Sequence, residues 1–132
     1  MVEQILSDLY RIEIPIPNSP LKALNSYLIK GHERFLMIDT GMNREACRRA
    51  MLSGLAELDV DLNRTDFFIT HLHADHSGLV GELATASSKV YFSEVEAALA
   101  DSLKKDGEAR FQELYTYFMS HGFPKDELDR AV

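Results

Sequence analysis

The sequence has a single cysteine, Cys47, so the chain cannot close an internal disulfide bond. This agrees with a reducing compartment, and the simplest interpretation of Cys47 is a small apolar residue on a helix. Long apolar runs are missing too. No stretch reaches the roughly 20 residues that a membrane span needs, and the start lacks the basic and apolar regions of a signal peptide. We therefore expect a cytoplasmic protein that does not contact a membrane.

Positive charge is scarce and scattered along the chain. Only 14 Lys and Arg residues stand against 21 Asp and Glu residues, which gives a formal net charge of −7. The basic residues form pairs, as at Arg48-Arg49 and Lys104-Lys105, whereas proteins that bind nucleic-acid backbones concentrate Lys and Arg in larger clusters. Nucleic acid is therefore not an expected partner. The acidity itself does not choose a substrate, and the substrate that we expect is a small molecule.

Hydrophobic spacing predicts an α+β fold. The 132 residues, 45% of them hydrophobic, suffice for one domain with a modest core. Alternation and turn residues predict strands over about 9–16, 24–29, 35–38, 67–69 and 90–92. Helical spacing predicts helices over about 44–58, 77–86, 93–103 and 107–120, and another that begins near residue 124. Asn43 is the expected cap of the first helix.

Three of the five histidines lie in one segment, residues 71–76 (His-Leu-His-Ala-Asp-His), directly after a predicted buried strand. Alternate residues of an extended segment share a face, so His71 and His73 can converge on one cation. Asp75 and His76, in the turn that follows, can face a second cation. These nitrogen and oxygen ligands, without a thiolate, suit Zn²⁺, and Fe and Mn²⁺ stay open. The competing interpretation is a histidine-rich surface turn or a tag remnant, but a tag would lie at a terminus.

Two motifs carry a resemblance to a known family. Residues 70–78 (Thr-His-Leu-His-Ala-Asp-His-Ser-Gly), after an apolar strand, resemble the metal-binding signature of the metallo-β-lactamase superfamily, which includes glyoxalase II-like thioesterases. Residues 25–41, which end in Asp39-Thr40-Gly41, are similar to the family's opening hairpin and its Asp-Thr-Gly motif. The resemblance implies that Asp39 lies beside the metal loop, where a carboxylate that does not touch the metal orients a metal-bound histidine.

The resemblance also implies the architecture. Residues 1–132 would form the first half of an αββα sandwich, with a mixed or antiparallel sheet that carries helices on one face. Within this single, truncated domain, residues 1–92 would belong to the sandwich and residues 93–132 would be a helical segment. The family completes its site with further His and Asp residues downstream, whereas His121 is the one histidine after His76 here, and no predicted strand is followed by His or Asp at a plausible position. The uncovered sheet predicts association into a homo-oligomer.

The activity that the resemblance implies is that of a metal-dependent hydrolase. His71, His73, Asp75 and His76 would hold two Zn²⁺ ions, whose bound hydroxide attacks a thioester, ester or lactam carbonyl. Asp75 would be the catalytic carboxylate that orients this hydroxide. Phosphodiester hydrolysis is an alternative within the superfamily, and a truncated metal-binding scaffold without activity is the alternative outside the enzymes. We expect little activity from the 132 residues alone.

Overall fold

A computed structural model describes residues 1–17, 19–122 and 124–130. It divides the chain into two units, Met1–Ser93 and a second unit that begins at Glu94. Each unit is described by itself. Within the described ranges, no helix is both long enough and apolar enough to cross a membrane.

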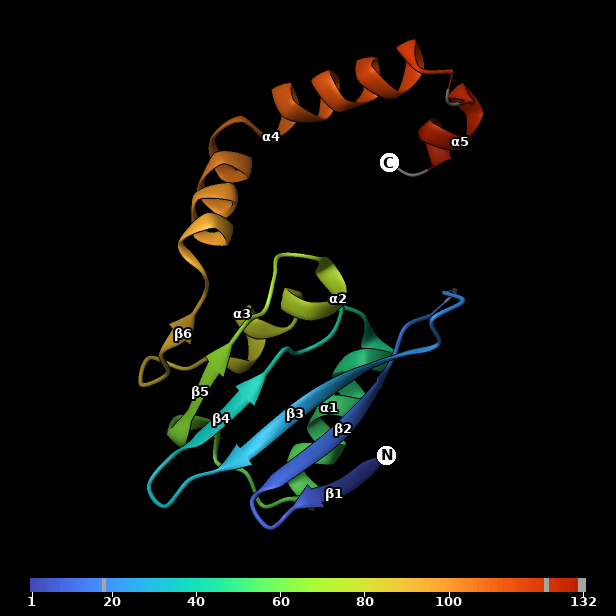
Figure 1. Cartoon of the computed structure of the whole chain (residues 1–132). Coiled ribbons are helices and arrows are strands. Elements are labelled where there is room, and N and C mark those ends of the chain that lie inside the picture. The colour runs from blue at the N-terminus through green and yellow to red at the C-terminus, as the bar shows by residue number, and fades with distance from the viewer. Residues whose placement is uncertain (18, 123, 131–132) are drawn as a thin grey trace. The chain divides into compact units, whose positions relative to one another are not determined.

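A six-stranded mixed sheet forms the first unit, and its strands lie side by side in chain order (Figure 1). The strands are β1 Val2–Leu6, β2 Leu9–Pro15, β3 Ala23–Lys30, β4 Phe35–Ile38, β5 Thr65–Phe68 and β6 Val90–Tyr91. Pairing is antiparallel from β1 to β4 and parallel from β4 to β6. The expected α+β class with a mixed sheet is confirmed, and the strands expected at 9–16, 24–29 and 35–38 are found within one residue at each end.

One face of this sheet forms the core. Alternate residues of the strands point to this face and are buried: Ile12, Ile14, Leu24, Leu28, Met37 and Phe67. Helix α1, Glu45–Glu57, contributes Cys47, Met51 and Leu55 to the same cluster. These three residues are spaced four apart and therefore lie on one side of the helix. Cys47 is thus the buried apolar helix residue that the sequence indicated.

The short helices differ from their predictions. A 3-10 turn, Leu62–Arg64, precedes β5, and two helices, α2 Ala74–Ser77 and α3 Val80–Leu83, replace the single helix expected at 77–86. A tertiary contact causes the break, because the Leu79 amide donates to the Gly41 carbonyl at 3.0 Å instead of to its own helix. The prediction that Asn43 caps α1 is also wrong, since Arg44 is the N-cap and makes no side-chain cap hydrogen bond.

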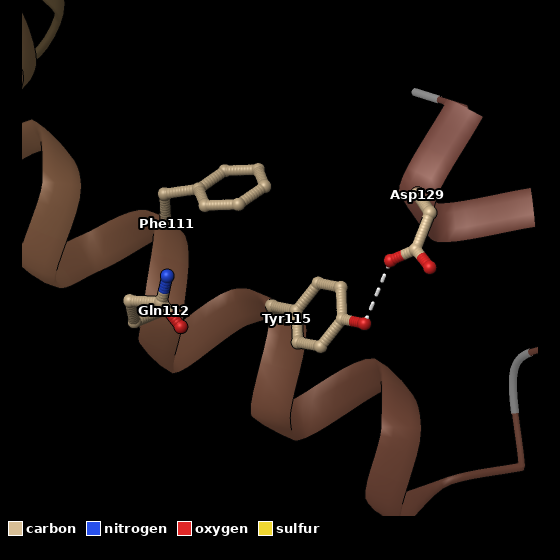
Figure 2. A pocket seen from close by; sticks show the side chains of 4 residues that line it. All are labelled: Phe111, Gln112, Tyr115 and Asp129. Carbon is tan, nitrogen blue, oxygen red and sulfur yellow. Dashed lines mark hydrogen bonds between the residues drawn. The ribbon is translucent and has the colours of Figure 1, made fainter. Parts of the chain in front are cut away.

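Two helices make up the described part of the second unit: α4 Glu94–Ser120 and α5 Lys125–Arg130. Helix α4 joins the two helices expected at 93–103 and 107–120 across a kink at Asp106, whose φ of −133° and ψ of 27° are not helical. The Tyr115 hydroxyl donates to Asp129 Oδ1 at 2.9 Å and so links the two helices (Figure 2). Hydrogen bonds from Lys125 and Tyr115 hold the pKa of Asp129 below its usual value.

Candidate metal centre

The Asp-Thr-Gly turn and the histidine loop meet at one edge of the sheet. Strands β4 and β5 are parallel neighbours, so their carboxyl ends lie at the same edge, next to α2 (Figure 1). The chain leaves β4 through Asp39, whose amide donates to the Phe68 carbonyl of β5 at 3.0 Å. Thr70 lies two residues after Phe68. Strand pairing therefore brings together two motifs that lie about 30 residues apart in the sequence.

Asp39 is the buried centre of this edge, with 5% of its surface exposed. Its Oδ1 accepts a hydrogen bond from the Thr70 amide at 2.8 Å, and its Oδ2 accepts from the Thr70 hydroxyl at 2.8 Å and from His76 Nδ1 at 2.7 Å. The backbone of Asp39 has a positive φ of 57°. The buried Ser26 hydroxyl supports this conformation by donating to the Asp39 carbonyl at 2.7 Å. Hydrogen bonds to its side chain and to its backbone therefore hold Asp39 in place.

The structure brings the four expected metal ligands together. His71 and His73 precede α2, and Asp75 and His76 lie within it. The His71 ring centroid lies 4.5 Å from that of His73 and 4.0 Å from that of His76. His71 Nε2 faces His73 Nδ1 at 3.0 Å, and His76 Nε2 faces Asp75 Oδ2 at 3.5 Å. The four side chains thus form two donor pairs, His71 with His73 and Asp75 with His76. In each donor pair, two atoms that could bind a metal face each other.

The loop and the turn pack closely against each other. The Thr40 amide and hydroxyl both donate to the His76 carbonyl, at 2.7 and 2.9 Å. A Cβ atom at Gly78 would lie 2.5 Å from the Ala74 oxygen and 2.7 Å from the Asn43 nitrogen. Because both neighbours are backbone atoms, only glycine permits this approach. Backbone contact and hydrogen bonds therefore join the turn and the loop.

The distances within the donor pairs suit a metal ion, but the number of ligands in each pair is low. Two ligands of one tetrahedral Zn²⁺, each about 2.0–2.2 Å from it, lie roughly 3.3–3.6 Å apart. The Asp75–His76 distance of 3.5 Å agrees with this value, and the His71–His73 distance of 3.0 Å is a few tenths of an ångström shorter. However, no group of three or more His, Cys, Asp or Glu side chains among the described residues could hold a metal ion. Each pair falls short of the three protein ligands usual in catalytic zinc sites.

Two residues of this edge escaped the sequence analysis. Ser26 is a buried polar residue on β3 between the inward-facing Leu24 and Leu28. Such an isolated hydroxyl in an apolar row is a signal of a buried polar partner. Thr70 directly precedes the first histidine, and the sequence marks it only as part of the motif. Its contacts with Asp39 depend on strand pairing, which local sequence does not show.

A concave surface lies in the other unit. Phe111, Gln112 and Tyr115 of α4 line it together with Asp129 of α5 (Figure 2). Its one carboxylate, Asp129, is already engaged by Tyr115 and by Lys125. The histidine loop, which has several donors facing one another, is therefore the stronger candidate for chemistry.

Comparison with known proteins gives the following relatives. Residues 21–131 match the family model described as metallo-beta-lactamase superfamily. The lactamase-like protein aptB of Emericella nidulans is 30% identical over 92 residues, which are 67% of this chain and 28% of that protein. The probable metallo-hydrolase YqjP of Bacillus subtilis is 35% identical over 74 residues, which are 55% of this chain and 23% of that protein.

A solved structure is also similar. The metallo-beta-lactamase family protein TTHA1429 from Thermus thermophilus superposes with a TM-score of 0.83 and 31% sequence identity. The superposition covers 96% of this chain and 42% of that protein. The chain thus spans less than half the length of each of these relatives.

Proposed function

The chain belongs to the metallo-beta-lactamase superfamily, and from this membership we propose that it carries the first half of a two-metal hydrolytic centre. His71 and His73 would hold one divalent cation, and Asp75 and His76 the other. One observation carries the proposal: the two members of each donor pair face each other, at 3.0 Å for His71 and His73 and at 3.5 Å for Asp75 and His76, beside a buried carboxylate. Zn²⁺ suits these nitrogen and oxygen donors best, with Fe or Mn²⁺ as alternatives.

Asp39 fixes the direction of His76. Because the carboxylate accepts the Nδ1 proton at 2.7 Å, the neutral ring is unprotonated at Nε2, the atom that faces Asp75. A histidine binds a cation only through an unprotonated nitrogen. The buried carboxylate thus holds His76 ready for a metal, in the way that outer carboxylates support metal-bound histidines.

Chemistry at this centre would use water as the nucleophile. When bound, the cations would supply a water that loses its proton near neutral pH and would stabilise negative charge on the substrate oxygen. Asp75 turns Oδ2 toward His76, and its other carboxylate oxygen can accept a hydrogen bond from the attacking water and orient it. The Ser77 hydroxyl instead donates to the Leu72 and His73 carbonyls, at 3.1 and 3.2 Å, and not to a base that would activate it as a nucleophile.

We propose a thioester, ester or lactam as the substrate class, as in a glyoxalase II-like enzyme. A carbonyl substrate needs no basic surface, whereas a nucleic acid would meet a chain with a net charge of −7. Phosphodiester hydrolysis is therefore the weaker alternative. We propose that the protein is located in the cytoplasm, because its single cysteine is free and buried.

The remaining ligands would come from outside these 132 residues. The chain spans less than half the length of its relatives. The sheet face opposite α1 exposes Ile29, Phe68 and Tyr91, each between 38% and 46% exposed, and a further part of the protein or a second copy would cover these side chains. The alternative is a scaffold without activity. It is supported by the small number of ligands, because the described residues contain no group of three donors that could hold a metal ion.

Hydrolysis assays separate the enzyme from the scaffold. The zinc-loaded chain is assayed with a thioester and with a chromogenic lactam, beside a folded chimera that joins it to the remaining part of TTHA1429. We expect slow turnover by the chain alone, and turnover by the chimera that a chelator and His71→Ala abolish and His32→Ala leaves unchanged. A zinc-loaded, folded chimera without turnover would favour the scaffold, and equal rates for chain and chimera would contradict incompleteness.

A further inference from the structure

Thr70 lies between Asp39 and His71 and contacts both. Its amide donates to Asp39 Oδ1 at 2.8 Å, and its hydroxyl oxygen lies 2.8 Å from Asp39 Oδ2 and 3.0 Å from His71 Nδ1. On the far side of the ring, His71 Nε2 lies 3.0 Å from His73 Nδ1. A continuous chain of hydrogen bonds therefore runs from the buried carboxylate to the first two histidines.

The number of available protons decides the direction of these bonds. A carboxylate has no proton to donate, so the one hydroxyl proton of Thr70 points to Asp39 Oδ2. The Thr70 oxygen can then only accept a hydrogen bond from His71, which places the His71 proton on Nδ1. Neutral imidazole carries a single N–H group, and Nε2 is consequently unprotonated.

We infer that Thr70 is a positioning residue that transmits the buried charge of Asp39 to His71 and fixes the neutral ring in its Nδ1-protonated tautomer. Asp39 fixes His76 in the same tautomer by direct contact. One carboxylate thus leaves Nε2 free on two histidines, one in each donor pair. The benefit for metal binding rests on the proposed function, whereas the tautomer itself does not.

His73 offers a rival explanation for the same tautomer. If His73 Nδ1 carries its proton, it donates to His71 Nε2 and leaves the His71 proton on Nδ1, with no need for Thr70. However, this contact can also run in reverse, because each ring can donate or accept. Only the contact with Asp39 has a fixed direction, and it reaches His71 through Thr70.

Imidazole nitrogen NMR of the metal-free chain tests the inference. At about two pH units above the ordinary histidine pKa of 6.5, we expect Nδ1-protonated tautomers for His71 and His76 in the wild type. Thr70→Val keeps the shape and removes the hydroxyl, and should move His71 toward the Nε2-protonated tautomer while His76 stays. Thr70→Ser should restore the wild-type tautomer, and His73→Ala should retain it.

Zinc affinity is the second measurement. We expect Thr70→Val to weaken zinc binding about tenfold, the lower end of the effect of losing an outer partner of a metal-bound histidine. Thr70→Ser should stay within about twofold of the wild type. The matched control is Thr116→Val, which removes an exposed hydroxyl from α4 and should change neither the tautomers nor the affinity.

The outcomes distinguish the two proposals. The inference about Thr70 is overturned if His71 keeps its Nδ1 proton in Thr70→Val or loses it in His73→Ala. A wild type with the expected tautomers that binds no zinc would overturn the proposed function and leave the role of Thr70 intact. Zinc binding by a wild type whose His71 carries its proton on Nε2 would do the opposite.

Discussion

The two units of the chain are stabilised in different ways. All the buried hydrophobic side chains of the described residues, from Ile12 to Leu83, lie in the unit Met1–Ser93. From Glu94 onward, no side chain that the structure describes is buried. Helix α4 exposes large apolar residues such as Val95 and Tyr117, which are 77% and 56% exposed. The second unit therefore depends on helix propensity and on weak surface pairs.

This difference shows where a precise site can be held. The candidate metal centre lies entirely on the first unit, where strand pairing and the buried Asp39 fix the ends of β4 and β5. Side chains that must stay within a fraction of an ångström of a metal need this kind of rigid support. The helical unit lacks such support, and none of the expected ligands lies on it.

The largest expected contrast compares one buried and one exposed phenylalanine. Phe67 is fully buried in the core of the first unit, whereas Phe111 on α4 is 40% exposed. Phe67→Ala should lower the free energy of unfolding by about 3–5 kcal/mol through lost burial and an unfilled cavity. Phe111→Ala should change it by less than about 0.5 kcal/mol. Urea unfolding followed by circular dichroism measures both, and similar losses would show that the second unit has a core of its own.

A pair of glycines gives the next contrast. Gly78→Ala would force a Cβ atom against backbone atoms at 2.5 and 2.7 Å, and should cost about 1–3 kcal/mol because the backbone must shift. Gly107→Ala, in α4, meets no atom within 4 Å and should stabilise its helix by up to about 1 kcal/mol. Thermal unfolding compares the two. A neutral Gly78→Ala would mean that the loop and the Asp-Thr-Gly turn are not rigidly packed.

The smallest expected contrast depends on pH. Asp66 on β5 accepts hydrogen bonds from the Arg34 guanidinium at 2.7 and 2.9 Å and from the Lys89 amide at 2.8 Å. These partners, Arg34 first, lower the pKa of Asp66. Its contribution to stability is therefore complete above the unfolded value of about 3.9 and is lost as the pH falls through the lower folded value.

Substitution isolates this contribution. Asp66→Asn should cost about 1–2 kcal/mol near neutral pH, and the difference from the wild type should shrink as the pH falls below about 4. Asp129→Asn, which alters an exposed ion pair of the second unit, should leave the stability of the sheet unchanged. Urea unfolding at a series of pH values measures both variants. A constant difference between wild type and Asp66→Asn would show that the Asp66 charge does not matter.

Much of the fold could be predicted from the sequence, because its signals are local. Partial alternation indicated β2, and apolar stretches bounded by turn residues indicated β3 and β4. The apolar residues Ala46, Ala50, Leu52 and Leu55 indicated α1. Only Leu55 of these is buried, and Leu52 is 46% exposed, because the helix turns Cys47 and Met51 to the core. Strand β1 was missed because its side chains are mostly exposed and backbone pairing with β2 holds it in place. No hydrophobic period marks such an edge strand.

The candidate site divides in the same way. The loop at 71–76 and the Asp39 turn are contiguous motifs, so their residue types were visible in the sequence. The links between them were not, because Thr70 reaches Asp39 through the pairing of β4 with β5. The split between α2 and α3 depends likewise on a contact with the distant Gly41 carbonyl. Tertiary contacts of this kind override local helix signals.

Zinc titration of the metal-free chain tests most directly the central claim that the loop at 71–76 is a metal centre. Two double variants, each lacking two histidines, are compared with the wild type: His71→Ala/His73→Ala and His32→Ala/His121→Ala. We predict that the first binds zinc at least tenfold more weakly than the wild type and that the second binds as the wild type does. Equal affinities for the two double variants would contradict the account.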